Sequence, residues 1–144
     1  MWAGADATLD LNGTSQTAKE LGGFGTVKGG TLAVTGTIQP GGRDAVGTLT
    51  VDGTALTSGT LVIDVAADGT CDKLVATGTL NLSNLNLVIA GAELDKGKRY
   101  EIATAASVSG SFASATLPES RWHVSVSGTK VTLSSVRGTV VIVR

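Results

Sequence analysis

Short runs of alternating polar and apolar residues, separated by glycines, fill the first two thirds of the chain. Every second residue in such a run is apolar, as in a strand that buries one face and exposes the other. The runs are four to six residues long, and the turns between them are short. The pattern therefore predicts strands at residues 31–34, 48–51, 60–65, 73–76 and 86–89.

The dipeptide Gly-Thr marks the boundaries of these runs and occurs eleven times. Glycine suits a turn, and the threonine that follows it opens the next β-prone stretch. The longer phrase Gly-Thr-Leu begins at Gly30, Gly47, Gly59 and Gly78, at intervals of 17, 12 and 19 residues. Residues 15–21 contain no such phrase and only a weak helical pattern, and we expect a turn there.

Two all-β architectures fit this pattern. An antiparallel sandwich has strands at intervals of about 8–12 residues and hairpin turns, for which Asn12-Gly13, Asp52-Gly53 and Asp68-Gly69 are suitable. A β-solenoid instead repeats one strand-turn phrase, at irregular intervals where its turns differ in length. Because Gly-Thr-Leu returns almost unchanged, we favour the solenoid and predict an all-β fold built as a parallel β-helix.

The solenoid predicts one continuous core in which each coil stacks on the coil before it. Aliphatic side chains of the strands are expected to point into this core and to contact their equivalents one coil away. These residues are Leu32, Leu49, Leu61, Leu74, Val75 and Leu87.

The composition changes after Ala90, where the Gly-Thr repetition stops and the charged stretch 93–99 begins. An open solenoid end exposes apolar core and free strand edges, so it needs a cover. We therefore expect residues 1–90 to form the coils and residues 91–144 to form a C-terminal cap of the same domain.

Three of the five aromatic residues lie in this last part of the chain: Tyr100, Phe112 and Trp122. We expect the cap to run from about Tyr100 onward, with Phe112 and Trp122 covering the last coil. The apolar residues 140–143 are expected to add an edge strand.

Several phrases resemble a known protein family. Residues 9–17 (LDLNGTSQT), 31–42 (TLAVTGTIQPGG) and 71–82 (CDKLVATGTLNL), followed by Gly110-Ser111-Phe112, are similar to the autotransporter-associated β-strand repeat, also called the passenger-associated transport repeat. The resemblance covers most of the chain and implies a right-handed parallel β-helix at the bacterial cell surface or outside the cell. It also implies an export signal that lies outside this sequence and a C-terminal part that helps the passenger to fold.

Charge and composition argue against several classes of partner. The net charge is −1 and the basic residues are scattered, so the chain has no electrostatic footprint for nucleic acid. No apolar run approaches the roughly 18–20 residues that span a bilayer. Cys71 is the only cysteine, which excludes an internal disulfide, and we expect it to be a small buried apolar residue.

Residues that could carry catalysis are few. His123 is the only histidine, and it lies in an alternating strand pattern, so we expect it to pack or to face solvent. Five aromatic residues offer little surface on which sugars could stack. We therefore expect no enzyme activity, no catalytic residues and no cofactor.

Two further kinds of site remain open. Asp64, Asp68 and Asp72 are four residues apart around one turn and could contribute to a calcium site, although ordinary solvated turn residues are the simpler interpretation. Thr-x-Thr pairs resemble those of ice-binding solenoids, but the intervals between Thr35–Thr37, Thr48–Thr50 and Thr77–Thr79 are uneven.

These observations predict a structural module: the stalk and cap of a secreted bacterial surface protein, stacked on the preceding coils of its parent chain. The alternative is an adhesin-type module that contacts glycans or host proteins through the side of the solenoid. Free strand edges also allow self-association.

Overall fold

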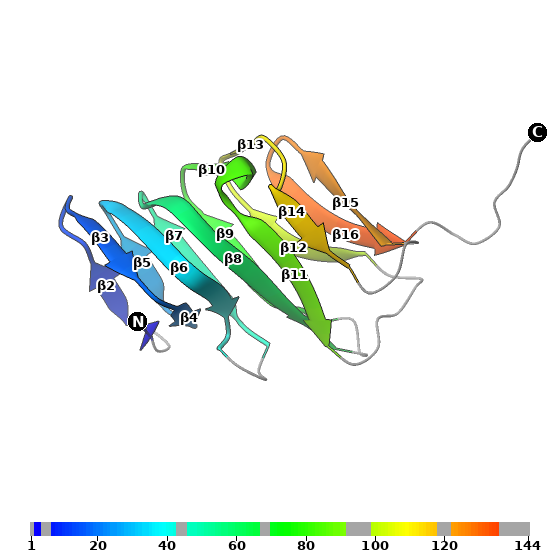
Figure 1. The fold of residues 1–144 in the computed structure, drawn as a ribbon, viewed down its shortest axis with the longest axis horizontal. Helices are drawn as coiled ribbons and strands as arrows, with labels where there is room; N and C mark the ends of the chain where they lie inside the picture. Colours follow the sequence, from blue (N-terminus) through cyan, green and yellow to red (C-terminus); the bar gives the residue numbers. More distant parts are fainter. Residues whose placement is uncertain are drawn as a thin grey trace, which may run out of the picture.

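The computed structural model describes residues 2–3, 7–42, 46–66, 70–91, 99–117 and 122–135, and these form a parallel β-solenoid. Two seven-stranded sheets face each other, and a two-stranded sheet lies at one corner between them (Figure 1). We call them sheets A, B and C. The only described element that is not a strand is a short 3-10 turn, η1 (Leu82–Asn84). The solenoid prediction is therefore confirmed and the antiparallel sandwich is excluded.

Sheet B is parallel along most of its length. Its strands follow one another coil by coil, each hydrogen-bonded to the strand one coil earlier. An antiparallel hairpin completes this sheet at its C-terminal end. The strands in spatial order are β2 (Thr8–Asp10), β5 (Thr26–Lys28), β7 (Thr48–Asp52), β9 (Lys73–Ala76), β12 (Tyr100–Thr104), β16 (Lys130–Ser135) and β15 (Trp122–Ser127).

Sheet A contains the longest strands, and all its pairings are parallel. Its main path is β1 (Trp2–Ala3), β4 (Leu21–Gly23), β6 (Thr31–Pro40), β8 (Ala55–Val65), β11 (Asn86–Gly91) and β14 (Ser114–Thr116), and β3 (Ser15–Ala18) also pairs with β6. Sheet C pairs β10 (Thr79–Asn81) with β13 (Ser107–Ser109). The expected turn at residues 15–21 is wrong, because Ser15–Ala18 pairs in register with Thr31–Val34.

Glycine allows the long strands to bend toward the next corner. Gly59 in β8 has φ +139°, and a Cβ atom on it would lie 2.7 Å from Cδ1 of Ile38 in the neighbouring coil. The register between β6 and β8 shifts twice around this point, once between Leu56 and Ser58 and once between Ser58 and Thr60. In the coils of β6 and β8 the chain therefore turns a corner within one long strand. In the next coil the corner is formed by β10 and η1.

The core consists of aliphatic residues that stack between coils. Leu49 lies opposite Leu74 in sheet B, and Leu61 lies opposite Leu87 in sheet A; all four are fully buried. Leu32 is buried as well, so five of the six predicted core positions are confirmed. Val75 is the exception. It alternates with buried Leu74 and Ala76, so its side chain lies on the outer face of sheet B and is half-exposed.

Hydroxyl groups also join the coils. Thr54, which is almost fully buried, donates its hydroxyl to the carbonyl of Gly29 at 2.7 Å. The hydroxyl of Ser58 donates to the carbonyl of Val34 at 2.9 Å, next to the bend in β8. These bonds satisfy backbone carbonyls at places where the regular ladder is interrupted.

The C-terminal end differs from the expected cap in where it begins. Strands β12, β13 and β14 each pair in parallel with a strand of the preceding coil, so Tyr100–Thr116 still belongs to the solenoid. The coils give way to the antiparallel hairpin of β15 and β16, whose outer strand contains Trp122. Trp122 is 3% exposed and packs against Tyr100, with ring centroids 6.1 Å apart. Trp122 is thus buried against the last coil, and its capping role stays a prediction, while the strand expected at residues 140–143 lies outside the described residues.

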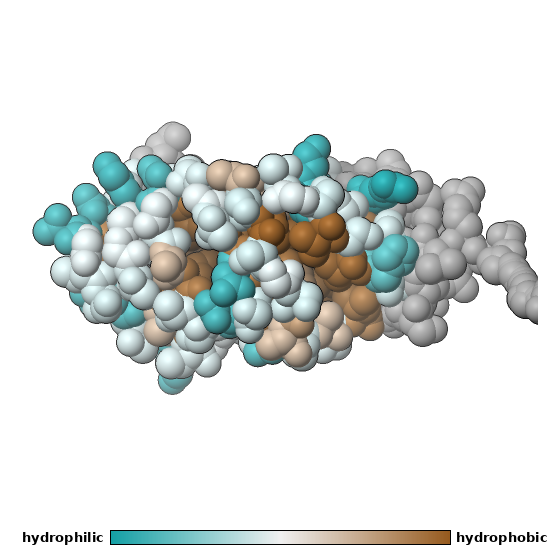
Figure 2. All heavy atoms as spheres, turned by 90° about the horizontal axis from the view of Figure 1, so that it is seen from above, coloured by the Kyte–Doolittle hydropathy of each residue, from teal (hydrophilic) through white to brown (hydrophobic). Residues whose placement is uncertain are grey.

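Some apolar surface of the last coil and the hairpin is exposed to solvent. Phe112, Leu117, Val108 and Val124 are only partly buried against the core, and Val126 is exposed. Seen from above, apolar atoms gather toward the C-terminal half of the solenoid, and polar residues surround them (Figure 2). Within the described ranges, no helix is long and apolar enough to cross a membrane.

Candidate functional site

The most unusual side chain of the solenoid is Asp72, at the corner where β8 ends and β9 begins. Its carboxylate is fully buried, which is rare for an aspartate. Oδ1 accepts the backbone N–H of Gly47 at 2.9 Å, and Oδ2 accepts that of Asp64 at 2.9 Å. Asp72 therefore ties the start of β7 to the end of β8, and its backbone N–H also donates to the carbonyl of Asp64 at 2.9 Å.

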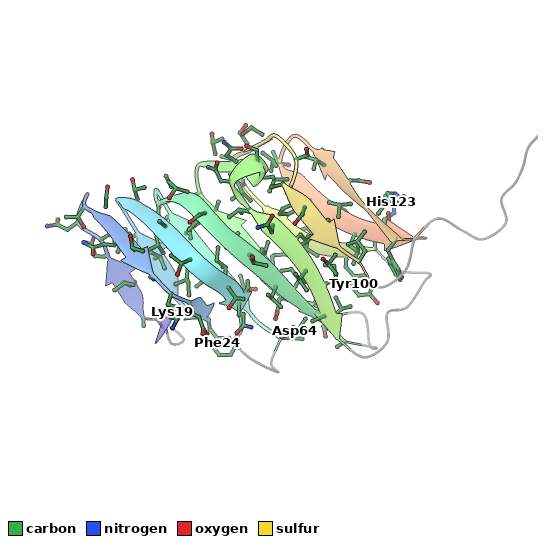
Figure 3. The ribbon with its side chains drawn as sticks, viewed as in Figure 1. Lys19, Phe24, Asp64, Tyr100 and His123 are labelled. Carbon is green, nitrogen blue, oxygen red and sulfur yellow. The ribbon has the colours of Figure 1, made fainter. Side chains whose placement is uncertain are left out.

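Glycine at position 47 lets the chain approach this carboxylate. The ring of Phe24 and the Cα atom of Gly41 occupy the space that a Cβ atom on Gly47 would need. The amide of residue 47 is therefore held next to Asp72 by packing from the preceding coil. The labelled side chains show Phe24 and Asp64 along the same edge of the solenoid (Figure 3).

The burial of Asp72 and the carboxyl group of Asp64 both affect the pKa of Asp72. The pKa of Asp72 is raised to about 7, mainly by burial and to a smaller extent by the charge and carboxyl group of Asp64, against the lowering effect of the two backbone N–H groups. At neutral pH Asp72 thus holds a proton for part of the time. The interpretation of Asp72 as a solvated turn residue is wrong.

The proposed calcium site has little support from this geometry. Both oxygens of Asp72 already accept backbone N–H groups, and Ca²⁺ needs six to eight oxygen ligands of its own. Asp68 lies outside the described residues. In the part of the chain that the structure describes, no group of three or more His, Cys, Asp or Glu residues is placed to hold a metal ion.

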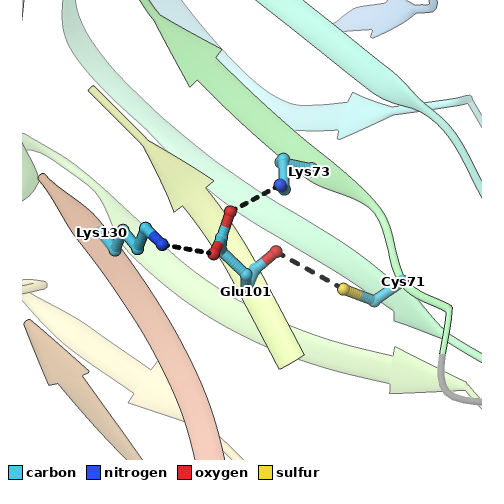
Figure 4. Close-up of polar contacts among 4 residues, drawn as sticks. All are labelled: Cys71, Lys73, Glu101 and Lys130. Atoms are coloured by element: carbon cyan, nitrogen blue, oxygen red, sulfur yellow. Dashed lines mark hydrogen bonds and ion pairs between the residues drawn. The ribbon is translucent and has the colours of Figure 1, made fainter. Parts of the chain in front are cut away.

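A second polar cluster joins three strands of sheet B near its C-terminal end (Figure 4). Oε1 of Glu101 on β12 accepts a hydrogen bond from Nζ of Lys73 on β9 at 2.7 Å. Oε2 of Glu101 lies 3.5 Å from Nζ of Lys130 on β16. These lysines lower the pKa of Glu101. The cluster therefore links the last coil to the hairpin, and its exposed position is typical of a structural ion pair.

Cys71 lies beside this cluster and is partly buried. Its Sγ donates to the backbone carbonyl of Glu101 at 3.7 Å. Burial and the charge of Asp72 raise the pKa of the thiol to about 11. This cysteine packs against the core as expected, although it is only partly buried, and its environment disfavours the reactive thiolate.

His123 lies near the C-terminal end of the solenoid, whereas Asp64 lies closer to the middle of its length (Figure 3). It is exposed on β15, and its Nε2 lies 3.3 Å from the hydroxyl of Ser134 on β16. Asp64 and Asp72, by contrast, lie at the corner between β8 and β9, so the structure does not bring the histidine together with this acid pair.

The three threonine pairs lie on different faces of the solenoid. Thr37 belongs to β6 in sheet A, Thr50 to β7 in sheet B, and Thr79 to β10 in sheet C. A different ladder forms on the outside of sheet B, where Thr8, Thr26 and Thr50 stand in register. Sequence spacing did not reveal this ladder, because only one of its members belongs to a Thr-x-Thr pair.

Charges on the outside of sheet B alternate along the solenoid. Asp10, Lys28 and Asp52 are register neighbours on β2, β5 and β7. The Lys73–Glu101–Lys130 cluster forms a second alternating group on β9, β12 and β16, in which Lys73 lies beside Thr48 of β7 and not beside Asp52. Unlike charges therefore face each other on β2, β5 and β7 and again on β9, β12 and β16, which favours this order of strands within each group.

In comparisons with known proteins, the chain matches no model of a protein family and no curated protein.

Proposed function

We propose that this chain is a structural stalk and cap segment of a secreted bacterial surface protein of the autotransporter type. In this role its coils support the folding of the passenger and hold a more distant region away from the cell. The observation that supports the proposal is the ladder of buried leucines, in which Leu49 stacks on Leu74 and Leu61 on Leu87. Such a core runs along the axis and lets each coil rest on the coil before it.

Surface display of a reporter tests this role. The chain would be placed between an export signal with a protein reporter and a bacterial outer-membrane anchor, and the intact reporter on the cells would be measured after protease treatment. We expect Leu74→Asp, which places a charge in the core, to reduce the amount of intact reporter severalfold. Thr50→Asp, on the outer face of the neighbouring strand, should leave it unchanged. Equal display by both variants would contradict the stalk.

The second candidate function is an adhesin-type binding module. The outer face of sheet B supports it, because the threonine ladder and the alternating charges form a regular polar surface. Binding of the isolated chain to a glycan array would test this function. Reproducible binding that is lost in Thr26→Lys would favour the binding module, and absence of binding would favour the stalk.

A further inference from the structure

We propose that Asn12 and Asn81 are acceptor sites for asparagine-linked sugars on one exposed edge of the solenoid. They begin the tripeptides Asn12-Gly13-Thr14 and Asn81-Leu82-Ser83, the two places where the sequence reads Asn-x-Ser or Asn-x-Thr without a proline between them. Asparagine-linked transfer recognises this tripeptide on the surface of secreted proteins. The proposal rests on the secretion of the chain and not on its role as a stalk.

Both asparagines lie on the edge of the solenoid where the chain passes from sheet B to sheet A. Asn12 follows β2 and precedes β3, and Asn81 is the last residue of β10 in sheet C, which lies at this corner. A coil between them turns at the same corner, because the N–H of Gly53 donates to the hydroxyl of Thr77, just before β10, at 3.0 Å. The turn between β2 and β3 and the strand β10 both lie along the upper edge in Figure 1. The two sites therefore share one side of the stack.

This edge has open space for a sugar. Asn12 and Asn81 are exposed, as are the residues that carry the hydroxyl group of each tripeptide. Gly13, Gly53 and Gly78 belong to three of the turns along this edge, and a Cβ atom added to any of them would meet no residue within 4 Å except its neighbours in sequence. A sugar on either asparagine can therefore extend into solvent without displacing a coil.

The amide of Asn81 is oriented by the hydroxyl residue of its own tripeptide. Its Oδ1 accepts the backbone N–H of Ser83 at 3.0 Å and the hydroxyl of Ser83 at 2.6 Å. Nδ2, the atom that receives the sugar, makes no hydrogen bond within the described part of the chain. The oxygen of the amide is thus held by Ser83, while its nitrogen is available for transfer.

Asn12 lies in a tight turn between β2 and β3. Its φ is +52° and that of Gly13 is +74°, and the N–H of Thr14 donates to the carbonyl of Leu11 at 3.0 Å. Two central residues with positive φ are typical of a two-residue turn between strands. The turn leaves the side chain of Asn12 exposed.

Asn84 and Asn86 are controls within the same chain. Both are exposed, but Asn86 and Val88, the residues two positions after them, carry no hydroxyl group. Nδ2 of Asn84 donates to the carbonyl of Leu56 at 3.4 Å, and Oδ1 of Asn86 accepts the hydroxyl of Ser114 at 2.8 Å. Transfer that followed exposure alone would include these two residues.

The transfer needs a sugar that is activated through phosphate. Nδ2 of the asparagine forms a bond to the anomeric carbon of the sugar, and the bond between that carbon and the phosphate oxygen breaks. The phosphate leaves with the electron pair, and a proton of Nδ2 passes to a base of the transferase. The co-reactant is therefore a nucleotide sugar or a sugar diphosphate on a lipid.

Sugar transfer to the purified, folded chain tests the proposal. One arm uses a soluble asparagine glycosyltransferase with a nucleotide-activated hexose, and the other uses a membrane oligosaccharyltransferase with a lipid-linked oligosaccharide. Each enzyme is first shown to be active on an unrelated acceptor peptide. Mass spectrometry of the intact chain and of its peptides measures the fraction modified at each asparagine. We expect sugar on Asn12 and Asn81 and none on Asn84 or Asn86, and the arm that gives it identifies the donor.

Variants of the tripeptides separate them from other causes of transfer. Asn81→Gln and Ser83→Ala should abolish the sugar at residue 81 and leave that on Asn12 unchanged, whereas Ser83→Thr should retain both. Asn12→Gln should have the converse effect. An asparagine that neither arm modifies in the folded chain is not an acceptor, which overturns the proposal for that residue. Equal modification of Asn84 and Asn86, or of the Ser83→Ala chain at residue 81, would overturn it for both. The stalk is tested separately, because display of the reporter is measured without a transferase.

Discussion

The direction of each side chain on its strand decides what single residues do in this solenoid. Alternation identified the buried leucines, because a strand with one apolar face shows this pattern directly in the sequence. It also explains why Val75 faces outward: apolar character alone suggested the core, but its neighbours Leu74 and Ala76 occupy the inner positions. Asp72 was beyond such reasoning, because Gly47, which binds its carboxylate, is 25 residues away.

Truncation of a core leucine should lower stability strongly. Leu49 is fully buried and stacks on Leu74 of the next coil, so Leu49→Ala removes apolar contacts and leaves a cavity. We expect the free energy of unfolding to fall by about 2–5 kcal/mol, measured by urea denaturation. The control is Thr50→Ala, on the outward side of the same strand, which should cost less than about 0.5 kcal/mol. Equal losses in both variants would argue against a continuous core.

The thiol of Cys71 should react slowly in the folded chain. Its pKa is raised from 9.0 to about 11 by burial first and then by the charge of Asp72. At about pH 8 the thiolate fraction is then about a hundredfold lower than for an unperturbed thiol. A disulfide reagent with a coloured product measures this rate, and the urea-unfolded chain serves as the reference. Similar rates in the two states would show that Cys71 is not shielded.

At the scale of strands, the sequence predicted the positions of the strands correctly but did not predict the length of one coil. Each strand predicted from alternation lies within a strand of the structure. The intervals between Gly-Thr-Leu phrases, however, do not measure the coil. Gly30 and Gly47 precede strands of opposite sheets, Gly59 lies within β8, and Gly78 precedes β10 of sheet C. The register partners on the outside of sheet B are 18, 24, 25 and 29 residues apart, at Thr8, Thr26, Thr50, Val75 and Thr104.

The hairpin of β15 and β16 should depend on its tryptophan. Trp122 is 3% exposed and lies against Tyr100, so Trp122→Ala should reduce the free energy of unfolding by about 3–5 kcal/mol. Thermal and urea unfolding measure the loss. Val126→Ala is a suitable control, because Val126 is 42% exposed on the same strand and its truncation should have little effect. A Trp122→Ala chain as stable as the control would show that the hairpin does not cover the last coil.

The whole molecule is a stack of coils in which the two large sheets end differently at the C-terminal side. Among the described strands, sheet A ends at β14, all three residues of which are exposed, whereas sheet B continues into the hairpin. The change of composition after Ala90 predicted a C-terminal part that differs from the coils, and the hairpin of β15 and β16 is the part that pairs differently. It did not show where the coils end, because β12 to β14 follow the same parallel pairing without the Gly-Thr phrase.

Removal of the hairpin should make the chain associate with itself. Deletion of residues 122–144 exposes the edge of β12 and the side chain of Tyr100, which is only 1% exposed in the full chain. Free strand edges next to apolar surface pair with other molecules. We expect light scattering to show dimers or larger species that the full chain does not form at the same concentration. A truncated chain that remains monomeric with an unchanged melting temperature would contradict a capping role.

The alternating charges on sheet B also restrict how such a protein could gain or lose repeats. If the coil that contains β5 and β6 were excised, β2 would meet β7, and Asp10 would stand beside Asp52 instead of Lys28. Strands in a sheet are only about 4.8 Å apart, so this junction would place two negative charges opposite each other. A gain of length is therefore best tolerated at this face when the repeats that contain β5 and β7 are duplicated together, because Asp52 is then followed by a second lysine and a second aspartate. Duplication of either repeat alone would place two like charges side by side.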